Sequence, residues 1–224
     1  MNIAFVPARI GSKSIPEKNI KIFCGKPLIY WTIKALLDAN IFDKIYIATD
    51  CVRISSYVNS FNVNNLNVFI RSEESATDKS PTEEVIIEFL NKVEFPNDSR
   101  FFLSQITNPF ITGEIIKCSL EQFNVSKVDS MLSVVKSSRF FWDSGGQPIN
   151  YDYKNRKRRQ DFEGVFMENG AFYINTIENI QKFKNRLSGK IGFFEMPNYT
   201  AHEIDTYDDW YFCEYLMKKY ILDL

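Results

Sequence analysis

Short apolar runs alternate along this chain with longer amphipathic stretches, and this alternation constrains the fold more than any other feature. Six of the runs have the length of buried strands: Ile3–Ala8, Lys44–Thr49, Val68–Ile70, Arg100–Ser104, Met131–Val135 and Ala171–Ile174. Strands that alternate with crossover helices form a mostly parallel sheet with helices on both faces. The sequence therefore predicts an α/β fold whose ligands bind on the loops after the strands.

Helices are predicted between the strands, wherever apolar residues recur at helical spacing. They cover Pro27–Ala39, a stretch that starts at Ser80, Gly113–Phe123 and Tyr207–Tyr220. The second has the clearest start, because Ser80 is followed by proline at the first helical position and by Glu83 three residues on. We expect Ser80 to cap this helix within a capping box.

The length and composition are those of one globular domain. With 224 residues and 45% hydrophobic residues, the chain is too apolar to be disordered and is expected to form a single domain over residues 1–224. Lys and Arg number 27 against 28 Asp and Glu, which gives a net charge of −1. That balance gives no reason to expect a nucleic acid or an anionic membrane as partner, so a small molecule is expected.

Neither a membrane span nor an export signal is expected. No stretch approaches the ~18 consecutive apolar residues of a span, and no basic region precedes the first apolar run. Cys24, Cys51, Cys118 and Cys213 are scattered without a C-x-x-C pair, which favours reduced thiols buried in the core over a disulfide framework or a metal clip. These features predict a cytoplasmic protein.

The loop after the first predicted strand has the composition of an anion site. Within the stretch 7–19 it combines one glycine and two serines with Arg9, Lys13 and Lys18. Small residues let backbone N–H groups turn toward an anion, and the cations neutralise phosphate charge. The spacing matches neither a P-loop nor a dinucleotide fingerprint. A solvated polar turn is the alternative, and the three cations favour phosphate binding.

The segment Ser137–Met167 does not fit the strand–helix alternation. It is polar, contains Gly145-Gly146, and carries the basic cluster Lys154–Arg159. We expect it to leave the sheet as an arm, with the aromatic run Phe140-Phe141-Trp142 serving as core or as a contact between subunits. A solvated loop or a nucleic-acid patch are the alternatives for the basic cluster, and the net charge of −1 disfavours nucleic acid.

Six segments follow one another in the order of a known family signature. They are Pro7-Ala8-Arg9-x-Gly11-Ser12-Lys13-x-Ile15-x-x-Lys18-Asn19 with Gly25-Lys26-Pro27-Leu28 behind it, Ala48-Thr49-Asp50, Arg71-Ser72-x-x-x-Ala76-Thr77-Asp78-x-Ser80, Ser104-Gln105-x-Thr107-x-Pro109, Arg159-Gln160 with Glu168-Asn169-Gly170-Ala171-Phe172-Tyr173-Ile174, and Glu203-Ile204-Asp205-Thr206. Together they resemble the signature of the CMP-acylneuraminate (CMP-sialic acid) synthetases, from residue 3 to about residue 212. The resemblance implies a Rossmann-like nucleotidyltransferase fold.

The resemblance also implies a reaction, in which CTP and an α-keto acid sugar give a CMP-sugar and pyrophosphate. Transfer of this kind needs positioning and charge neutralisation more than covalent help. The residues implied for CTP are Arg9, Gly11, Ser12, Lys13, Lys18, Asn19, Arg71, Ala76, Asp78 and Ser80. Arg9 and Lys18 are expected to act catalytically on charge at the α-phosphate and the leaving group. For Asp78 a solvated turn carboxylate is the alternative.

A divalent cation, Mg²⁺ or another, is implied as cofactor. Asp205 is the expected catalytic metal ligand, with Glu203 beside it, because residues two apart in an extended segment share a face. The alternative is that Asp205 or Thr206 caps the last helix. Asp208 and Asp209 are expected only to favour the positive end of that helix.

The residues implied for the sugar are Gln105, Arg159, Gln160 and Asn169. A nonulosonic acid carries a carboxylate, for which arginine is a two-pronged partner. The family's L-Q-P-T-S-P-x-R stands here as residues 104–111 without its Pro, Ser and Arg, so the particular sugar stays open. The single histidine, His202, is left out of the site because a lone histidine more often packs.

The sequence supports two other functions less well. A 3-deoxy-manno-octulosonate cytidylyltransferase would carry Q-G-D-E-P where this chain has Gln105-Ile106-Thr107-Asn108-Pro109, and the missing carboxylate favours the acylneuraminate type. A non-catalytic nucleotide-binding protein is disfavoured by the intact Arg9, Lys18 and Asp205. By resemblance we expect a homodimer in which the 137–167 arm brings Arg159 near the partner's sugar.

Overall fold

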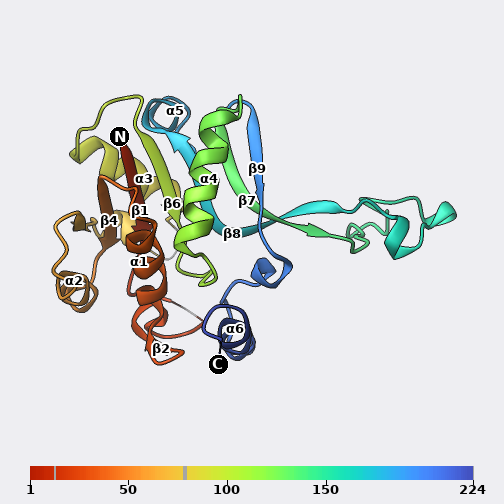
Figure 1. Cartoon of the computed structure of the whole chain (residues 1–224), viewed down its shortest axis with the longest axis horizontal. Coiled ribbons are helices and arrows are strands. Elements are labelled where there is room, and N and C mark those ends of the chain that lie inside the picture. The colour runs from red at the N-terminus through yellow and green to blue at the C-terminus, as the bar shows by residue number, and fades with distance from the viewer. Residues whose placement is uncertain (13, 78–79, 224) are drawn as a thin grey trace.

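A seven-stranded sheet forms the centre of the computed structural model, which describes residues 1–12, 14–77 and 80–223 (Figure 1). Its strands are β1 (Asn2–Pro7), β4 (Lys44–Thr49), β5 (Leu66–Ile70), β6 (Arg100–Ser104), β7 (Ser130–Ser137), β8 (Val165–Thr176) and β9 (Ile191–Glu195). They are ordered β5-β4-β1-β6-β8-β7-β9, and only β8 runs antiparallel to its neighbours in this sheet. The mostly parallel sheet confirms the predicted α/β class.

Helices cover both faces of this sheet. One face packs against α1 (Leu28–Ala39), α2 (Val52–Asn59), α4 (Gly113–Val125) and α6 (Tyr207–Tyr220), and the other against α3 (Thr82–Lys92) and α5 (Ile177–Phe183). In β1, Ala4 and Val6 face the first layer whereas Ile3 and Phe5 face the second, as the period of two requires. Within the described residues no helix is both long and apolar enough to span a membrane.

Several predicted elements have the observed bounds, and several short ones were not predicted, among them the antiparallel pair β2 (Ile22–Phe23) and β3 (Lys26–Pro27). Lys44–Thr49, Arg100–Ser104 and Tyr207–Tyr220 agree residue for residue, whereas β5 begins two residues before the predicted Val68. The helices α2 and α5 and the edge strand β9 were not predicted. Each is short and buries few side chains, so its apolar pattern is weak.

The predicted capping box at Ser80 is wrong. Pro81 occupies the N-cap position and makes no side-chain capping bond. The Ser80 hydroxyl donates to the Glu74 carbonyl at 2.7 Å, and Glu83 accepts two hydrogen bonds from Arg186 at 2.6 and 3.0 Å. Both side chains have partners outside the helix, so they do not close a capping box at its start.

The cysteines are free thiols, as predicted, but they are not all buried in the core. Only Cys213 is buried, Cys24 and Cys51 are partly buried, and Cys118 is exposed on α4. Cys118 therefore fills no core space.

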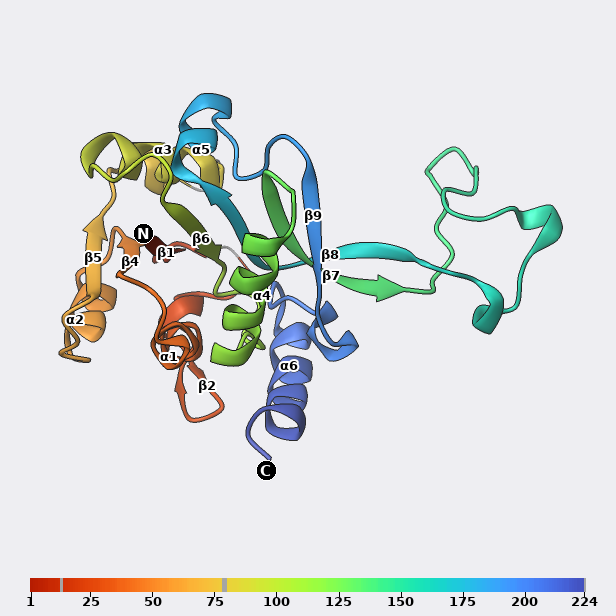
Figure 2. The same cartoon turned by 45° about the horizontal axis from the view of Figure 1, so that its top comes forward.

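The segment between β7 and β8 projects well away from the rest of the molecule (Figures 1 and 2). We call residues 138–164 the arm; it contains two short 3₁₀ turns, Tyr153–Asn155 and Arg159–Asp161. Its side chains pack among themselves, with the Phe140 ring 4.2 Å from Tyr151 and 4.9 Å from Phe162. Trp142 is about half exposed at 49%.

Candidate active site

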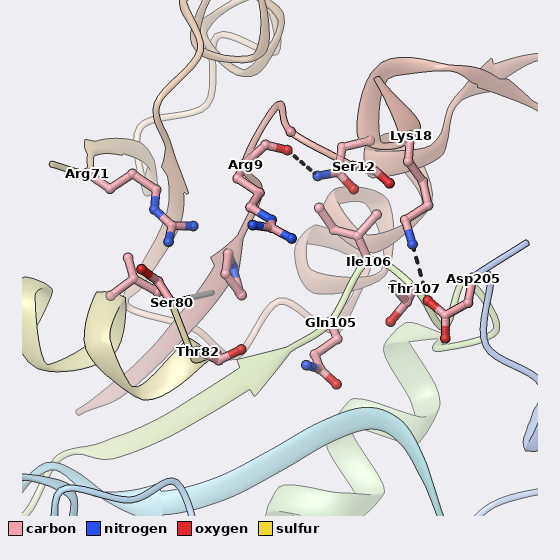
Figure 3. A pocket seen from close by; sticks show the side chains of 14 residues that line it. Arg9, Ser12, Lys18, Arg71, Ser80, Thr82, Gln105, Ile106, Thr107 and Asp205 are labelled. Carbon is pink, nitrogen blue, oxygen red and sulfur yellow. Dashed lines mark hydrogen bonds and ion pairs between the residues drawn. The ribbon is translucent and has the colours of Figure 1, made fainter. Parts of the chain in front are cut away.

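A cavity of about 290 Å³ opens at the carboxyl ends of β1 and β6 (Figure 3). From β1 the chain adds β4 and β5 on one side and then crosses to add β6 on the other. The loops after β1 and β6 therefore diverge, and such a switch point is where parallel sheets bind ligands. The N-terminus of α3 closes one wall through Thr82 and Val85, which the sequence analysis did not single out.

The loop after β1 lines the cavity and is fixed by side chains at both ends. Arg9, Gly11, Ser12, Lys18 and Asn19 all line it, whereas Lys13 lies outside the described residues. The Asn19 amide donates to the Arg9 carbonyl at 2.8 Å, which closes the loop on itself.

A second fixed point comes from the next strand in the chain. Asp50, directly after β4, accepts a hydrogen bond from the Ile10 N–H at 3.0 Å. Arg53 on α2 pairs with Glu17, which has a left-handed backbone at φ 53°. No sequence pattern assigned a role to Asp50 or Arg53, because each acts only on the position of the loop.

Three cationic side chains converge on the cavity. Arg9 and Arg71 bring their guanidinium groups toward one another from different loops, and Lys18 reaches in from a third direction (Figure 3). Arg71 is 7% exposed, and burial, aided by the charge of Arg9, lowers the pKa of its guanidinium against the pull of Asp50. An anion between them would relieve this repulsion, so the cavity favours a polyanion.

Among the described residues that line the cavity, Asp205 is the one carboxylate. Its side chain is 72% exposed, and Lys18 Nζ lies 3.4 Å from its Oδ1 while donating to the Ile204 carbonyl at 2.7 Å (Figure 3). Asp205 does not cap α6. Thr206 caps the helix and forms a capping box with Asp209. Of Asp208 and Asp209, only Asp209 takes part in this cap.

Glu203 lies beneath this surface and does not line the cavity. Its carboxylate accepts a hydrogen bond from the Thr107 hydroxyl at 3.1 Å and sits against Gly170, where a Cβ would overlap it. Burial raises the pKa of Glu203, and the nearby Asp205 charge raises it further. Of these two described residues, Asp205 offers an open carboxylate and Glu203 a partly buried one.

This donor set fits a hard cation that keeps most of its waters. Among the described residues no three His, Cys, Asp or Glu side chains cluster as a complete metal cage. Mg²⁺ commonly takes one or two protein carboxylates together with phosphate oxygens. Asp205, facing a cavity that suits phosphates, meets that requirement.

The segment 71–80, which is expected to contact the cytosine base of CTP, lies only partly at the cavity. Arg71 and Ser80 line it, Ala76 lies in the short turn Glu74–Ala76 and does not, and Asp78 lies outside the described residues. Glu88 of α3 supports this loop by accepting from the Ser72 N–H at 2.9 Å and from the Ser75 hydroxyl.

The residues expected at the sugar are divided between three places. Gln105 lines the cavity. Asn169 is 1% exposed, and its amide donates to the Thr200 hydroxyl at 3.0 Å. Arg159 and Gln160 lie on the arm, which projects away from the body (Figure 2), and neither lines the cavity.

The chain matches a family model described as cytidylyltransferase over residues 3–222. Similar proteins include an N-acylneuraminate cytidylyltransferase of Oncorhynchus mykiss, 36% identical over 92% of this chain and 48% of that protein. A pseudaminic acid cytidylyltransferase of Campylobacter jejuni is 27% identical over 97% of this chain and 96% of that protein. The chain spans about half the length of the Oncorhynchus relative and nearly all of the Campylobacter one.

Solved structures give the same fold at low sequence identity. A CMP:2-keto-3-deoxy-manno-octonic acid synthetase complexed with CTP superposes with a TM-score of 0.71 at 17% identity, covering 97% of this chain and 98% of that one. A 4-diphosphocytidyl-2C-methyl-D-erythritol synthase from Anaerococcus prevotii also has a TM-score of 0.71, at 12% identity, covering 97% and 96%.

Proposed function

Because the chain belongs to the cytidylyltransferase family, we propose that it activates a sialic acid-like nonulosonic acid by transfer of a cytidylyl group from CTP. The anomeric oxygen of the sugar attacks the α-phosphorus, the bond to the β-phosphate oxygen breaks, and pyrophosphate leaves. CTP and the acid sugar give the CMP-sugar and pyrophosphate. Relatives that act on acylneuraminate and on pseudaminic acid support this class of acceptor.

The convergence of Arg9, Arg71 and Lys18 on one cavity, with Asp205 at its edge, is the observation that carries this proposal. A triphosphate brings about four negative charges, and three buried or half-buried cations offset them without a covalent step. Arg9 and Lys18 are the residues that would stabilise the charge that develops as the α-phosphate reacts. Gly11, Ser12 and Asn19 would shape the loop around the phosphates.

A divalent cation belongs to this proposal. Asp205 would hold it, with Glu203 as a second carboxylate within electrostatic reach. When bound, Mg²⁺ supplies charge neutralisation to the triphosphate and the leaving group. The chain's own contribution is to keep the Asp205 carboxylate at the cavity while Lys18 holds the adjoining carbonyl of Ile204.

We also propose that the enzyme is a homodimer whose arm completes the partner's sugar site. The arm projects away from its own body (Figure 2), and Arg159, which lies on the arm, does not line the cavity of its own chain. A guanidinium delivered from a second subunit would pair with the sugar carboxylate, while Gln105 contacts the sugar from within the chain.

Pyrophosphate release tests the reaction. Purified protein with Mg²⁺ is given CTP, ATP, GTP or UTP, each with and without N-acetylneuraminate, pseudaminate, legionaminate or 3-deoxy-manno-octulosonate. We expect release only with CTP and a nonulosonic acid, and formation of the corresponding CMP-sugar. Turnover with 3-deoxy-manno-octulosonate alone would assign the sister activity, and CTP binding without any turnover would support a non-catalytic binding protein.

A further inference from the structure

Three buried polar residues join the loop after β6, the bulge of β8 and the turn before Asp205. Asn108, Asn169 and Thr200 are 0%, 1% and 0% exposed. The Asn108 amide donates to the Asn169 carbonyl at 2.7 Å and to the Thr200 carbonyl at 2.9 Å. The Asn169 amide donates to the Thr200 hydroxyl at 3.0 Å. We call these three residues the amide clasp.

The bulge in β8 is what presents the Asn169 carbonyl to this clasp. The register between β7 and β8 shifts between Leu132 and Val134, and Gly170 has a φ of 63°. The Ser133 hydroxyl lies in the gap and accepts from the Phe172 N–H at 3.0 Å. A bulge of this kind redirects the backbone and is common beside active sites.

The clasp and one backbone bond fix both ends of the short segment that leads to Asp205. Thr200 is held by Asn108, and the Ile204 N–H donates to the carbonyl of the adjoining Thr107 at 2.8 Å. Asp205 itself is mostly exposed, and its only described side-chain neighbour within ion-pair distance is Lys18. Its place at the cavity therefore comes from the main chain beneath it.

We infer that Asn108 is a positioning residue for the reaction, acting through the main chain of residues 200–205 on the Asp205 carboxylate. This inference rests on the proposed function. It also reassigns Asn169, which the sequence placed at the sugar, to the support of this segment. Asn108 stands where the family signature has serine, so this chain carries a donor that can bridge two carbonyls at once.

Replacing Asn108 by alanine leaves the Asn169 and Thr200 carbonyls without this donor. We expect Asn108→Ala to lower kcat by about 10²-fold while KM for CTP changes less than about threefold, because misplacement of a reacting-site group by ~1 Å costs that much in rate. Thr200→Val keeps the shape and removes one bond of the clasp, so a smaller loss in the same direction is expected.

Asn175→Ala is the matched control. Asn175 is also 1% exposed and its amide makes two hydrogen bonds, to the Arg186 carbonyl at 3.0 Å and the Ser188 hydroxyl at 3.2 Å. Asn175 lies on β8, the strand that also contains Asn169, and pairs with Phe101 at the end of β6 remote from the cavity. Its loss should lower stability to a similar degree and leave kcat near wild type.

Hydrogen–deuterium exchange of the ligand-free proteins separates this inference from the proposed function. Amides of residues 200–206 should exchange at least about tenfold faster in Asn108→Ala and Thr200→Val, and at the wild-type rate in Asn175→Ala. Unchanged exchange in the clasp variants overturns the inference, as does faster exchange with kcat unchanged in an active enzyme. If wild type shows no turnover, the proposed function fails while the exchange result still decides whether the clasp holds this segment.

Discussion

At the scale of single residues, the cavity places a restrained cation beside an exposed carboxylate. The Lys18 side chain is 11% exposed and donates to the Ile204 carbonyl, whereas the Asp205 side chain is 72% exposed. A lysine held in this way has its ammonium group in position before a ligand binds. An exposed carboxylate keeps its oxygens available for a cation that arrives with a nucleotide.

Asp205→Asn should reduce kcat by at least ~10²-fold while the protein stays folded, because a lost metal carboxylate removes charge stabilisation from the transition state. Steady-state kinetics at saturating Mg²⁺ and a thermal melt measure the two effects. Asp208→Asn is the control, because Asp208 is exposed on α6 and does not line the cavity. It should leave kcat and the melting temperature nearly unchanged. Wild-type rates in Asp205→Asn would remove the metal assignment.

Arg9→Ala and Lys18→Ala should each lower kcat more than they raise KM for CTP, because their charges are expected to meet the α-phosphate as it reacts. Lys21→Ala is a matched control, since Lys21 lies over the Tyr207 ring at 5.5 Å and does not line the cavity. Initial rates over a range of CTP concentrations give both constants. A variant in which only KM rises would show that its side chain binds ground-state phosphate without assisting the chemistry.

At the scale of elements, helix α3 holds the loop that contains Arg71 in place through hydrogen bonds to Glu88. Burial alone would raise the pKa of Glu88, but hydrogen bonds from Lys92, from the Ser75 hydroxyl and from the Ser72 N–H together lower it below its ordinary value. The ionised form of Glu88 is therefore favoured in the folded state. Its charge fastens the loop of residues 71–76 to the helix.

Glu88→Gln should lower the free energy of unfolding by about 1–3 kcal/mol at neutral pH, because hydrogen bonds to a charged acceptor are lost. A carboxyl with a lowered native pKa stabilises fully above its unfolded value, near 4.5, and this stability is lost as the pH falls through the native value. Urea unfolding from pH 7 to pH 3 should show the two proteins converging only at the acid end. Glu84→Gln, exposed on the same helix, should follow wild type throughout, and a constant difference for Glu88→Gln would refute the charge argument.

At the scale of the whole molecule, the arm projects away from the body of its own chain (Figures 1 and 2). Its aromatic side chains pack on one another, and Trp142, Tyr153 and Ile149 are 49%, 53% and 65% exposed. An extension of this length without its own core is expected to serve a function. A second subunit would cover these side chains and bring Arg159 to another cavity.

Complementation between two inactive variants tests this arrangement. Arg159→Ala and Asp205→Asn are co-refolded at equal amounts, and about a quarter of wild-type activity should return, since half of the dimers are mixed and each mixed dimer has one intact site. Lys18→Ala mixed with Asp205→Asn is the control, because both changes affect the body's own cavity and no site is restored. Absence of recovery in the first mixture, with dimers present, would show that each site is built from one chain.

The sequence by itself determined most strands of the sheet and most of its helices, but not the edge strand β9. Runs such as Lys44–Thr49 and Arg100–Ser104 agree with the structure because burial on both faces of a parallel sheet demands a continuous apolar stretch, which is a local signal. The position of Arg9 and Lys18 at a ligand-binding edge was also predictable, because a parallel sheet places the loops after its strands at one edge.

Only the tertiary structure decided which partner each polar side chain takes. Ser80 does not cap its helix because the Glu74 carbonyl lies within reach, and Glu83 pairs with Arg186, 103 residues along the chain. Asn169 lies inside, among the clasp, although its motif suggested the sugar. Hydrophobic burial follows a period that can be read locally, whereas a hydrogen bond depends on which distant carbonyl or hydroxyl the fold brings within about 3 Å.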